Sequence, residues 1–314
     1  MTEEDYPKTF EEFIDRFQSE DDCIDYIKRL RWPNGFVCPR CQCAKAWKTS
    51  RYLMHCARCG HQTSITAGTL FQKTRKPLRI WFHVMWWMMS QKTGASAKNL
   101  KDAMGFGSYK TAWAWLHKFR RAMIRPGRDR LNGVVEIDET YIGGEEEGSK
   151  GRQLIKKALV VIAVDVEERK LGRVRFRCIP DASAESLVPF VQDYVELEST
   201  TITDGWKGYA PLEKCGYRHE IRKIAGSGKK ASELLPHVHI VVSLLKRWLM
   251  GTHQGAVSSV HLPYYLDEFA FRFNRRLSRY RGKLFYRLMQ QAVITEATPL
   301  EKLFVNKRPR QQNT

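Results

Sequence analysis

The sequence has almost no acidic charge over one long stretch. Residues 31–132 contain twenty Lys and Arg but only two acids, Asp102 and Asp129, so this stretch has a net charge of +18. Residues 1–30 carry ten acids against four bases, and residues 133–314 carry 22 acids against 29 bases. The formal net charge of +19 is therefore concentrated in one segment. Because so much charge exceeds what solubility needs, the segment indicates a polyanionic partner.

Long hydrophobic runs are also missing. The most apolar run, Ile80–Met89, is too short to span a bilayer. The first residues, MTEEDYPKTF, are acidic and do not resemble a secretory or transit peptide. We therefore expect a soluble intracellular protein with no membrane partner. An apolar content of 43% and nine Trp exclude a disordered chain, and 314 residues allow two domains or one elaborated domain.

Four of the eight cysteines form a metal-binding pattern. Two C-x-x-C pairs, CPRC and CARCG, are separated by fourteen residues; the cysteines are Cys38, Cys41, Cys56 and Cys59. Four thiolates with this spacing can close tetrahedrally around Zn²⁺, and the polar segment between them fits a short hairpin. This predicts a zinc ribbon. We expect the nearby Cys43, His55 and His61 not to be ligands, and Cys23, Cys178 and Cys215 to be ordinary buried thiols.

The basic stretch continues with helical periodicity. We expect a helical segment over Thr69–Met89, in which Pro77 suits the first turn of a helix from Leu78 to Ser90. A helix from Ser96 to Met104, a break at 105–107, and a helix from Tyr109 to Met123 follow. A helix, a glycine turn and a second helix are the outline of a helix-turn-helix, although a plain helical bundle has the same outline. The charge and the ribbon favour DNA binding. On the last helix we expect an apolar core face, and an outward face of Lys110, Trp113, Lys118, Arg120 and Arg121.

The second half of the chain predicts a mixed α/β sheet of ribonuclease H type. Short β-rich runs cover 134–138, 158–166, 173–179 and 200–203, with an amphipathic helix over 182–195. The first and last runs end in acids, Asp138 and Asp204, which would place two carboxylates at a sheet edge. Phosphodiester chemistry uses hard cations held by carboxylates. An acid at a strand end is usually a turn cap. The DNA-binding segment upstream is the reason to interpret this pair of acids as a metal site.

Three strings resemble the IS1595-type, ISXO2-like insertion-sequence transposases. They are VVEIDETYIGG (134–144), ITDGWKGY (202–209) and the segment from Val238 to Arg276, and the N-terminal ribbon also fits that family. The resemblance implies a ribonuclease-H-like, DDE-type transposase that cuts DNA at insertion-sequence ends and joins the 3′-hydroxyl ends to target DNA with Mg²⁺ or Mn²⁺. It further implies double-stranded DNA as partner, at least a dimer on DNA, and a cytoplasmic, nucleoid-associated location.

Carried over by position, the family's catalytic residues fall on Asp138, Asp204, His239 and Lys246, where His239 occupies the third carboxylate position. Seven residues of helix nearly complete two turns, so His239 and Lys246 should share one helix face. Imidazole suits Mn²⁺ or Zn²⁺ better than Mg²⁺. Three interpretations follow: His239 binds a softer metal, it acts by proton transfer or a hydrogen bond, or an acid completes the site, with Glu136, Glu139 and Glu233 as candidates.

We also expect a C-terminal helix over 267–276 with a core stripe and a basic face of Arg272, Arg275 and Arg276 for DNA, extended by Arg279. The predicted division is an acidic helical leader (1–30), the ribbon (31–66), a helical DNA-binding segment (67–131), a catalytic domain (132–290) and a tail (291–314). The alternatives are a zinc-ribbon regulator, a structure-specific nuclease that cuts without joining, and a relic that has lost its activity.

Overall fold

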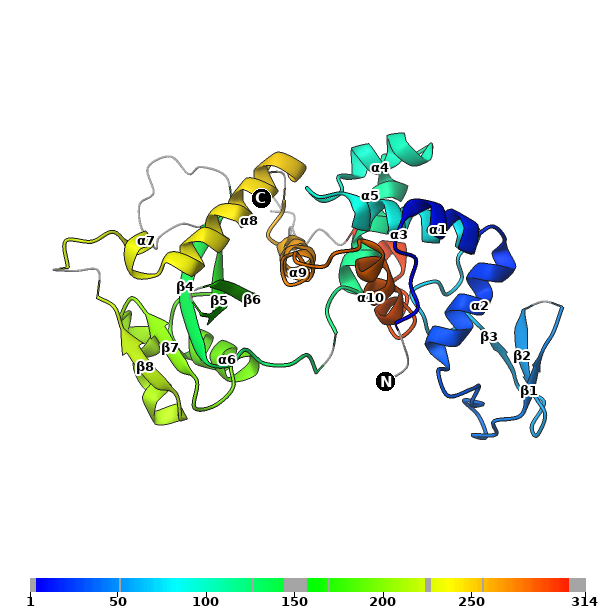
Figure 1. Cartoon of the computed structure of the whole chain (residues 1–314), viewed down its shortest axis with the longest axis horizontal. Coiled ribbons are helices and arrows are strands. Elements are labelled where there is room, and N and C mark those ends of the chain that lie inside the picture. Colours follow the sequence, from blue (N-terminus) through cyan, green and yellow to red (C-terminus); the bar gives the residue numbers. More distant parts are fainter. Residues whose placement is uncertain are drawn as a thin grey trace, which may run out of the picture. The chain divides into compact units, whose positions relative to one another are not determined.

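The computed structural model of the chain describes residues 4–50, 52–125, 127–143, 157–168, 170–223, 227–255 and 257–304. Of these, residues 4–125 and 278–304 form one compact unit, here called the helical unit, and residues 127–277 form a second, the sheet unit (Figure 1). Of the predicted tail (291–314), residues 305–314 lie outside the described residues. Among the described helices, none is long and apolar enough to cross a membrane.

The core of the helical unit is built from both ends of the chain. Helices α1 (Phe10–Arg16), α2 (Glu20–Arg31) and α3 (Leu78–Ser90) pack with α10 (Gly282–Ala292). Helix α3 has Pro77 as its N-cap residue and no side-chain cap of its own. The carboxylate of Glu20 accepts the backbone N–H groups of Leu78 and Arg79 instead, at 2.7 and 3.2 Å. This long-range cap fixes where α3 begins.

The two helices that were predicted around the glycine turn are confirmed, although Ser108 before the second makes no side-chain capping bond. They are α4 (Ala97–Met104) and α5 (Tyr109–Arg121), joined by the expected turn; the short α11 is Leu300–Leu303. Ser96 caps α4 by accepting the Asn99 N–H, and Gly105 ends it with a φ of 63°, which favours glycine. The expected helix from Leu78 to Ser90 is confirmed as α3. Residues 69–77, also expected to be helical, instead form turns stabilised by local bonds such as that from Thr69 Oγ1 to Thr66 O.

The ribbon is a small antiparallel sheet with the order β1-β2-β3. Its strands are β1 (Ala46–Lys48), β2 (Leu53–Cys56) and β3 (Gln62–Ser64). The predicted hairpin corresponds to β1 and β2 and is confirmed. The third strand lies beyond the second cysteine pair.

The sheet unit contains the mixed, ribonuclease-H-like sheet that the sequence predicts, in the order β6-β5-β4-β7-β8. The strands are β4 (Val134–Ile142), β5 (Ala158–Glu167), β6 (Lys170–Ile179), β7 (Thr200–Thr203) and β8 (Arg218–Ile221). The first three are antiparallel, whereas β7 and β8 run parallel to β4. The sequence analysis named no strand at β8 and no 3-10 helix η1 (Lys207–Cys215).

Helices cover both faces of this sheet. Helices α8 (Pro236–His253) and α9 (Leu262–Phe273) pack on one face, with buried side chains such as Val241, Leu245 and Phe269. Helix α6 (Ala184–Tyr194) and η1 cover the other face, and the short α7 (Ala231–Leu234) precedes α8 (Figure 1). The expected stripe of Tyr265, Phe269 and Phe273 on α9 is buried.

Candidate functional site

The four ribbon cysteines lie together as a metal site would require. Among the described residues they form the one group of three or more possible ligands whose atoms all lie within 4.8 Å of one another. The Cys38 and Cys59 sulfurs are 3.7 Å apart, and those of Cys41 and Cys56 are 3.5 Å apart. A tetrahedral Zn²⁺ with bonds of about 2.3 Å separates its sulfurs by about 3.8 Å, so the cluster fits structural zinc.

The local backbone and the neighbouring rings support this ligand set. A backbone N–H of Cys59 lowers the pKa of the Cys56 thiol to about 6, which favours the thiolate that binds metal. His55 instead stacks on the ring of Trp47 with centroids 4.5 Å apart, and its Nδ1 lies 3.3 Å from Gln62 Nε2. His55 is therefore outside the ligand group, as the sequence analysis expects.

Removal of zinc is expected to unfold the ribbon, because its strands are short and few of their side chains are buried. After treatment with a strong chelator, limited proteolysis should cut between Cys38 and Ser64, and added Zn²⁺ should restore protection. Cys56→Ser should be cut without a chelator. Cys43→Ser is the matched control, and equal resistance of the two variants would contradict the assignment.

Asp138 and Asp204 come from adjacent parallel strands. The register pairs Glu136 with Ile202, so two residues further on Asp138 and Asp204 face the same side of the sheet. Burial, and to a smaller extent the charge of Asp204, raise the pKa of Asp138. Asp138 lies inside β4 and not at its end, because β4 stays paired with β5 as far as Ile142. Only the pairing of β4 with β7 stops before Asp138.

His239 approaches this pair from α8. Its Nε2 atom lies 3.4 Å from Asp138 Oδ2, and Pro236 occupies the first turn of the helix as the sequence suggests. That nitrogen is buried and makes no hydrogen bond with the described residues. The ligand atoms of Asp138, Asp204 and His239 do not all lie within 4.8 Å of one another. The donors are two carboxylates and an imidazole nitrogen, a set that suits a divalent cation.

Glu136 has a role that the sequence analysis did not identify. Its side chain is fully buried, and its Oε2 accepts the backbone N–H groups of His237 and Val238 at 2.8 and 3.0 Å. Its Oε1 lies 2.7 Å from His237 Nδ1. Glu136 thus caps α8, whose own N-cap residue supplies no side-chain bond. This cap attaches the start of α8 to β4 two residues before Asp138, and so places His239 against Asp138.

The other two acids considered for the third position lie elsewhere. Glu233 is exposed on α7, ahead of the helix that carries His239. Glu139 neighbours Tyr209, a fully buried residue in the core on the α6 side of the sheet. Burial, followed by the charges of Glu139 and Asp138, raises the pKa of the Tyr209 phenol. His239 is therefore the side chain from a neighbouring helix that reaches Asp138.

Lys246 lies on α8 seven residues after His239, in accordance with the expected spacing. Lys246 is exposed on the surface of α8. Partial burial of its side chain, and to a smaller extent the charge of Lys157, lower its pKa. Lys157 directly precedes β5, whose first residue, Ala158, pairs with Ile142 at the end of β4. The charge that Lys157 and Lys246 share is therefore near the end of β4, beyond Asp138.

The basic residues of α5 are not all on an outward face. Arg120 is 1% exposed and donates from Nη2 to Ala95 O at 3.3 Å, because it lies one turn after the buried Leu116. The expectation that it faces outward is wrong. Lys118 is half-buried with its Nζ 5.6 Å from the ring centroid of Trp81, whereas Lys110 is exposed and Arg121 is half-buried.

The arginines of the α9 region are engaged within the sheet unit. Arg272 pairs with the fully buried Glu268 at 2.9 Å, and Arg276 donates to the carbonyl groups of Leu171 and Gly172. The Arg275 guanidinium lies 4.1 Å from the ring centroid of Phe271. The Arg276 bonds hold the segment after α9 on β6, whereas the partners of Arg272 and Arg275 lie within α9.

Two family models match this chain, and both describe the same transposase family. The profile of the ISXO2-like transposase domain matches residues 130–274, and that of the transposase zinc-ribbon domain matches residues 18–62. A search of curated proteins finds no match. Among solved structures, a pre-cleavage Mos1 transpososome is similar at 12% identity over 67% of this chain and 74% of that chain, with a TM-score of 0.27. A Mos1 strand transfer complex is similar at 13% identity over 68% and 76%, with a TM-score of 0.28. These overlaps are too loose to carry an argument.

Proposed function

Because this chain belongs to the IS1595-type transposases, we propose that its sheet unit cleaves phosphodiester bonds at insertion-sequence ends and joins the 3′-hydroxyl ends to target DNA. The observation that carries the proposal is that His239 Nε2 lies 3.4 Å from Asp138 of β4, beside the parallel strand β7 that Asp204 directly follows. Separate segments of the chain thus supply one polar site.

In this proposal Asp138 and Asp204 hold the catalytic divalent cation. Carboxylate oxygens are its preferred ligands, and the half-buried Asp138 gains charge compensation when a cation binds. Such a cation, when bound, polarises the phosphate and activates the attacking oxygen. Glu136 positions His239 through the α8 cap, and Lys246 contacts a phosphate of the strand.

His239 acts in the third position as a nitrogen ligand or as a hydrogen-bond donor to phosphate, and the metal preference distinguishes the two roles. If its buried Nε2 is a ligand, Mn²⁺ should support cleavage better than Mg²⁺, because imidazole suits Mn²⁺ better. In His239→Asp the preference should move toward Mg²⁺. Cleavage assays in each metal measure the ratio, and equal activity of the natural chain in both metals would exclude the ligand role.

The DNA ends are held by the zinc ribbon and by Lys110, Lys118 and Arg121 of α5 in the helical unit, which contains residues 31–125 of the strongly basic stretch. The buried Arg120 contributes to the fold of this unit and not to the DNA surface. Joining of paired ends needs at least a dimer on DNA. Work on chromosomal DNA would place the protein in the cytoplasm with the nucleoid.

An assay with labelled insertion-sequence ends tests the function. A transposase gives joined product, a structure-specific nuclease gives cleavage only, and a zinc-ribbon regulator or an inactive relic gives binding without reaction. Joined product in the presence of Mg²⁺ or Mn²⁺ is the expected result. Cleavage without joining at every metal and target concentration would overturn the proposal.

A further inference from the structure

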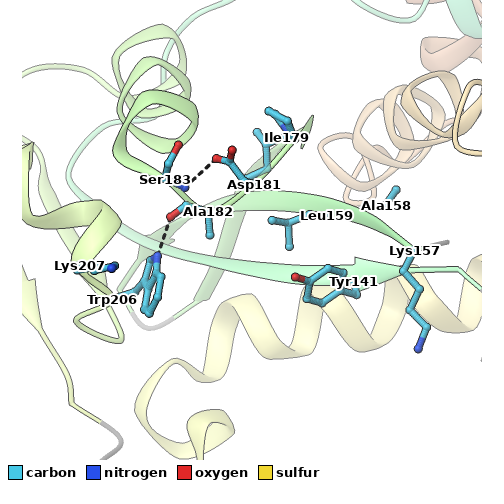
Figure 2. A pocket seen from close by; sticks show the side chains of 11 residues that line it. Tyr141, Lys157, Ala158, Leu159, Ile179, Asp181, Ala182, Ser183, Trp206 and Lys207 are labelled. Atoms are coloured by element: carbon cyan, nitrogen blue, oxygen red, sulfur yellow. Dashed lines mark hydrogen bonds between the residues drawn. The ribbon is translucent and has the colours of Figure 1, made fainter. Parts of the chain in front are cut away.

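A hollow at one edge of the sheet unit is lined by aromatic rings and lysines. Its volume is 460 Å³, which is within the range of about 300–1,000 Å³ for small-molecule pockets. The end of β4, the start of β5, the segment from β6 to α6 and the loop after β7 form its walls (Figure 2). The lining side chains used below are Tyr141, Lys157, Asp181, Ser183, Trp206 and Lys207.

This hollow is connected to the proposed catalytic acids through two short segments. The backbone N–H of Trp206 donates to Asp204 Oδ1 at 2.9 Å, while the Trp206 indole lines the hollow. Tyr141 follows Asp138 by three residues on β4 and points to the opposite face of the strand. Because the Trp206 loop directly follows Asp204, a DNA strand whose phosphate lies at Asp204 would pass close to the Trp206 side of the hollow.

The Trp206 ring is held in a fixed orientation. Its Nε1 donates to Ala182 O at 2.7 Å, as Figure 2 shows. Gly208 is packed so closely that an added Cβ would lie 2.5 Å from Ala182 O and 3.1 Å from Trp206 Cδ1. The loop is thus fixed to the segment before α6, and a ring that is already ordered loses little entropy when a ligand stacks on it.

The chemistry of the lining suits a nucleobase more than a phosphate. Tyr141 and Trp206 offer faces or edges for stacking, whereas Asp181 places a carboxylate in the wall and would repel an anion. Asp181 Oδ1 accepts hydrogen bonds from the Ser183 N–H and the Ser186 hydroxyl, and these two bonds hold the carboxylate in a fixed orientation. Its other oxygen, Oδ2, could accept a hydrogen bond from a base. In Figure 2, Lys207 and Lys157 lie at opposite ends of the group of side chains, where they could pair with the phosphates on either side of a base.

We propose that this hollow holds one unpaired base of the DNA strand that is cut at Asp138 and Asp204. The inference rests on the function proposed above and adds to it a subsite for a single base. Holding that base out of the stack would fix the position of the neighbouring phosphodiester along the strand.

Binding of the full-length protein to two duplexes tests this subsite. Both carry the insertion-sequence end with an unpaired nucleotide at the terminal phosphodiester, and in one of them that nucleotide is abasic. Fluorescence anisotropy should show at least about fivefold tighter binding of the duplex with the base, the effect of one stacking contact. Trp206→Ala should abolish this preference, whereas Trp206→Phe should keep most of it.

Trp47→Ala is the matched control, because Trp47 is an exposed tryptophan in the ribbon, and this variant should keep the preference for the base. Equal binding of the two duplexes by the natural chain would overturn the subsite, as would a preference that persists in Trp206→Ala. If the preference is present but no cutting or joining occurs, the subsite stands and the proposed function fails. If neither duplex is bound, both fail.

Discussion

Asp138→Asn is expected to abolish cleavage and joining and to leave end binding unchanged. The substitution keeps the shape of the side chain and removes the negative charge proposed to hold the cation. Loss of several kcal/mol of transition-state stabilisation lowers the rate by about a thousandfold or more. In the proposed function the helical unit binds the DNA ends, whereas Asp138 lies in the sheet unit. The assay with labelled ends measures the reaction, and anisotropy with the same DNA measures binding.

Thermal unfolding separates a catalytic role of Asp138 from a structural one. Burial raises the pKa of Asp138, so the folded state binds more protons than the unfolded state between the two pKa values. Its charge therefore costs stability as the pH rises through that range. Without divalent metal at neutral pH, Asp138→Asn should melt at the same temperature as the natural chain or higher.

The matched control for this variant is Asp193→Asn. Asp193 is exposed on α6 and pairs with Arg177 at 2.7 Å, and such surface pairs contribute about 0–1 kcal/mol. This variant should cut and join normally. A joined product from Asp138→Asn at the natural rate would remove Asp138 from the site.

The sequence predicts those parts of the fold that depend on local patterns. Strand periodicity locates the sheet, Ser96 and Gly105 locate α4, and paired cysteines locate the ribbon. These signals involve residues a few positions apart, so a single sequence contains them. The position of His239 follows from the family resemblance, and the structure brings it to Asp138.

Contacts between distant residues account for what the sequence did not predict. The Glu136 carboxylate caps a helix that begins 100 residues later, and β4 alone gives no sign of that partner. Arg120 lies in a basic run that suggests an outward face, but its position one turn after Leu116 directs it to the core. The hollow beside Trp206 needs four segments to meet, so no single motif contains it.

Phe285→Ala is expected to destabilise the helical unit by about 3–5 kcal/mol, the cost of removing a fully buried aromatic side chain. Phe285 is 0% exposed on α10. Its ring lies 5.5 Å from that of Phe13, 5.8 Å from that of Phe82 and 5.7 Å from that of Trp86, measured between centroids. These partners come from α1 and α3. Phe285 follows the sheet unit in the sequence, and it completes a core whose other rings come from before that unit.

A loss of this size is a large part of the 5–15 kcal/mol that stabilises a typical domain. End binding should therefore weaken on warming well before the sheet unit unfolds, and hydrogen exchange should show lost protection in α1, α2, α3 and α10 but not in the sheet unit. Ile294→Ala is the matched control, since Ile294 lies just beyond α10 with 64% exposure and should change the stability little. Equal melting of Phe285→Ala and the natural chain would mean that α10 is dispensable. The expected result means instead that DNA binding by the N-terminal segment requires the part of the chain beyond the catalytic residues.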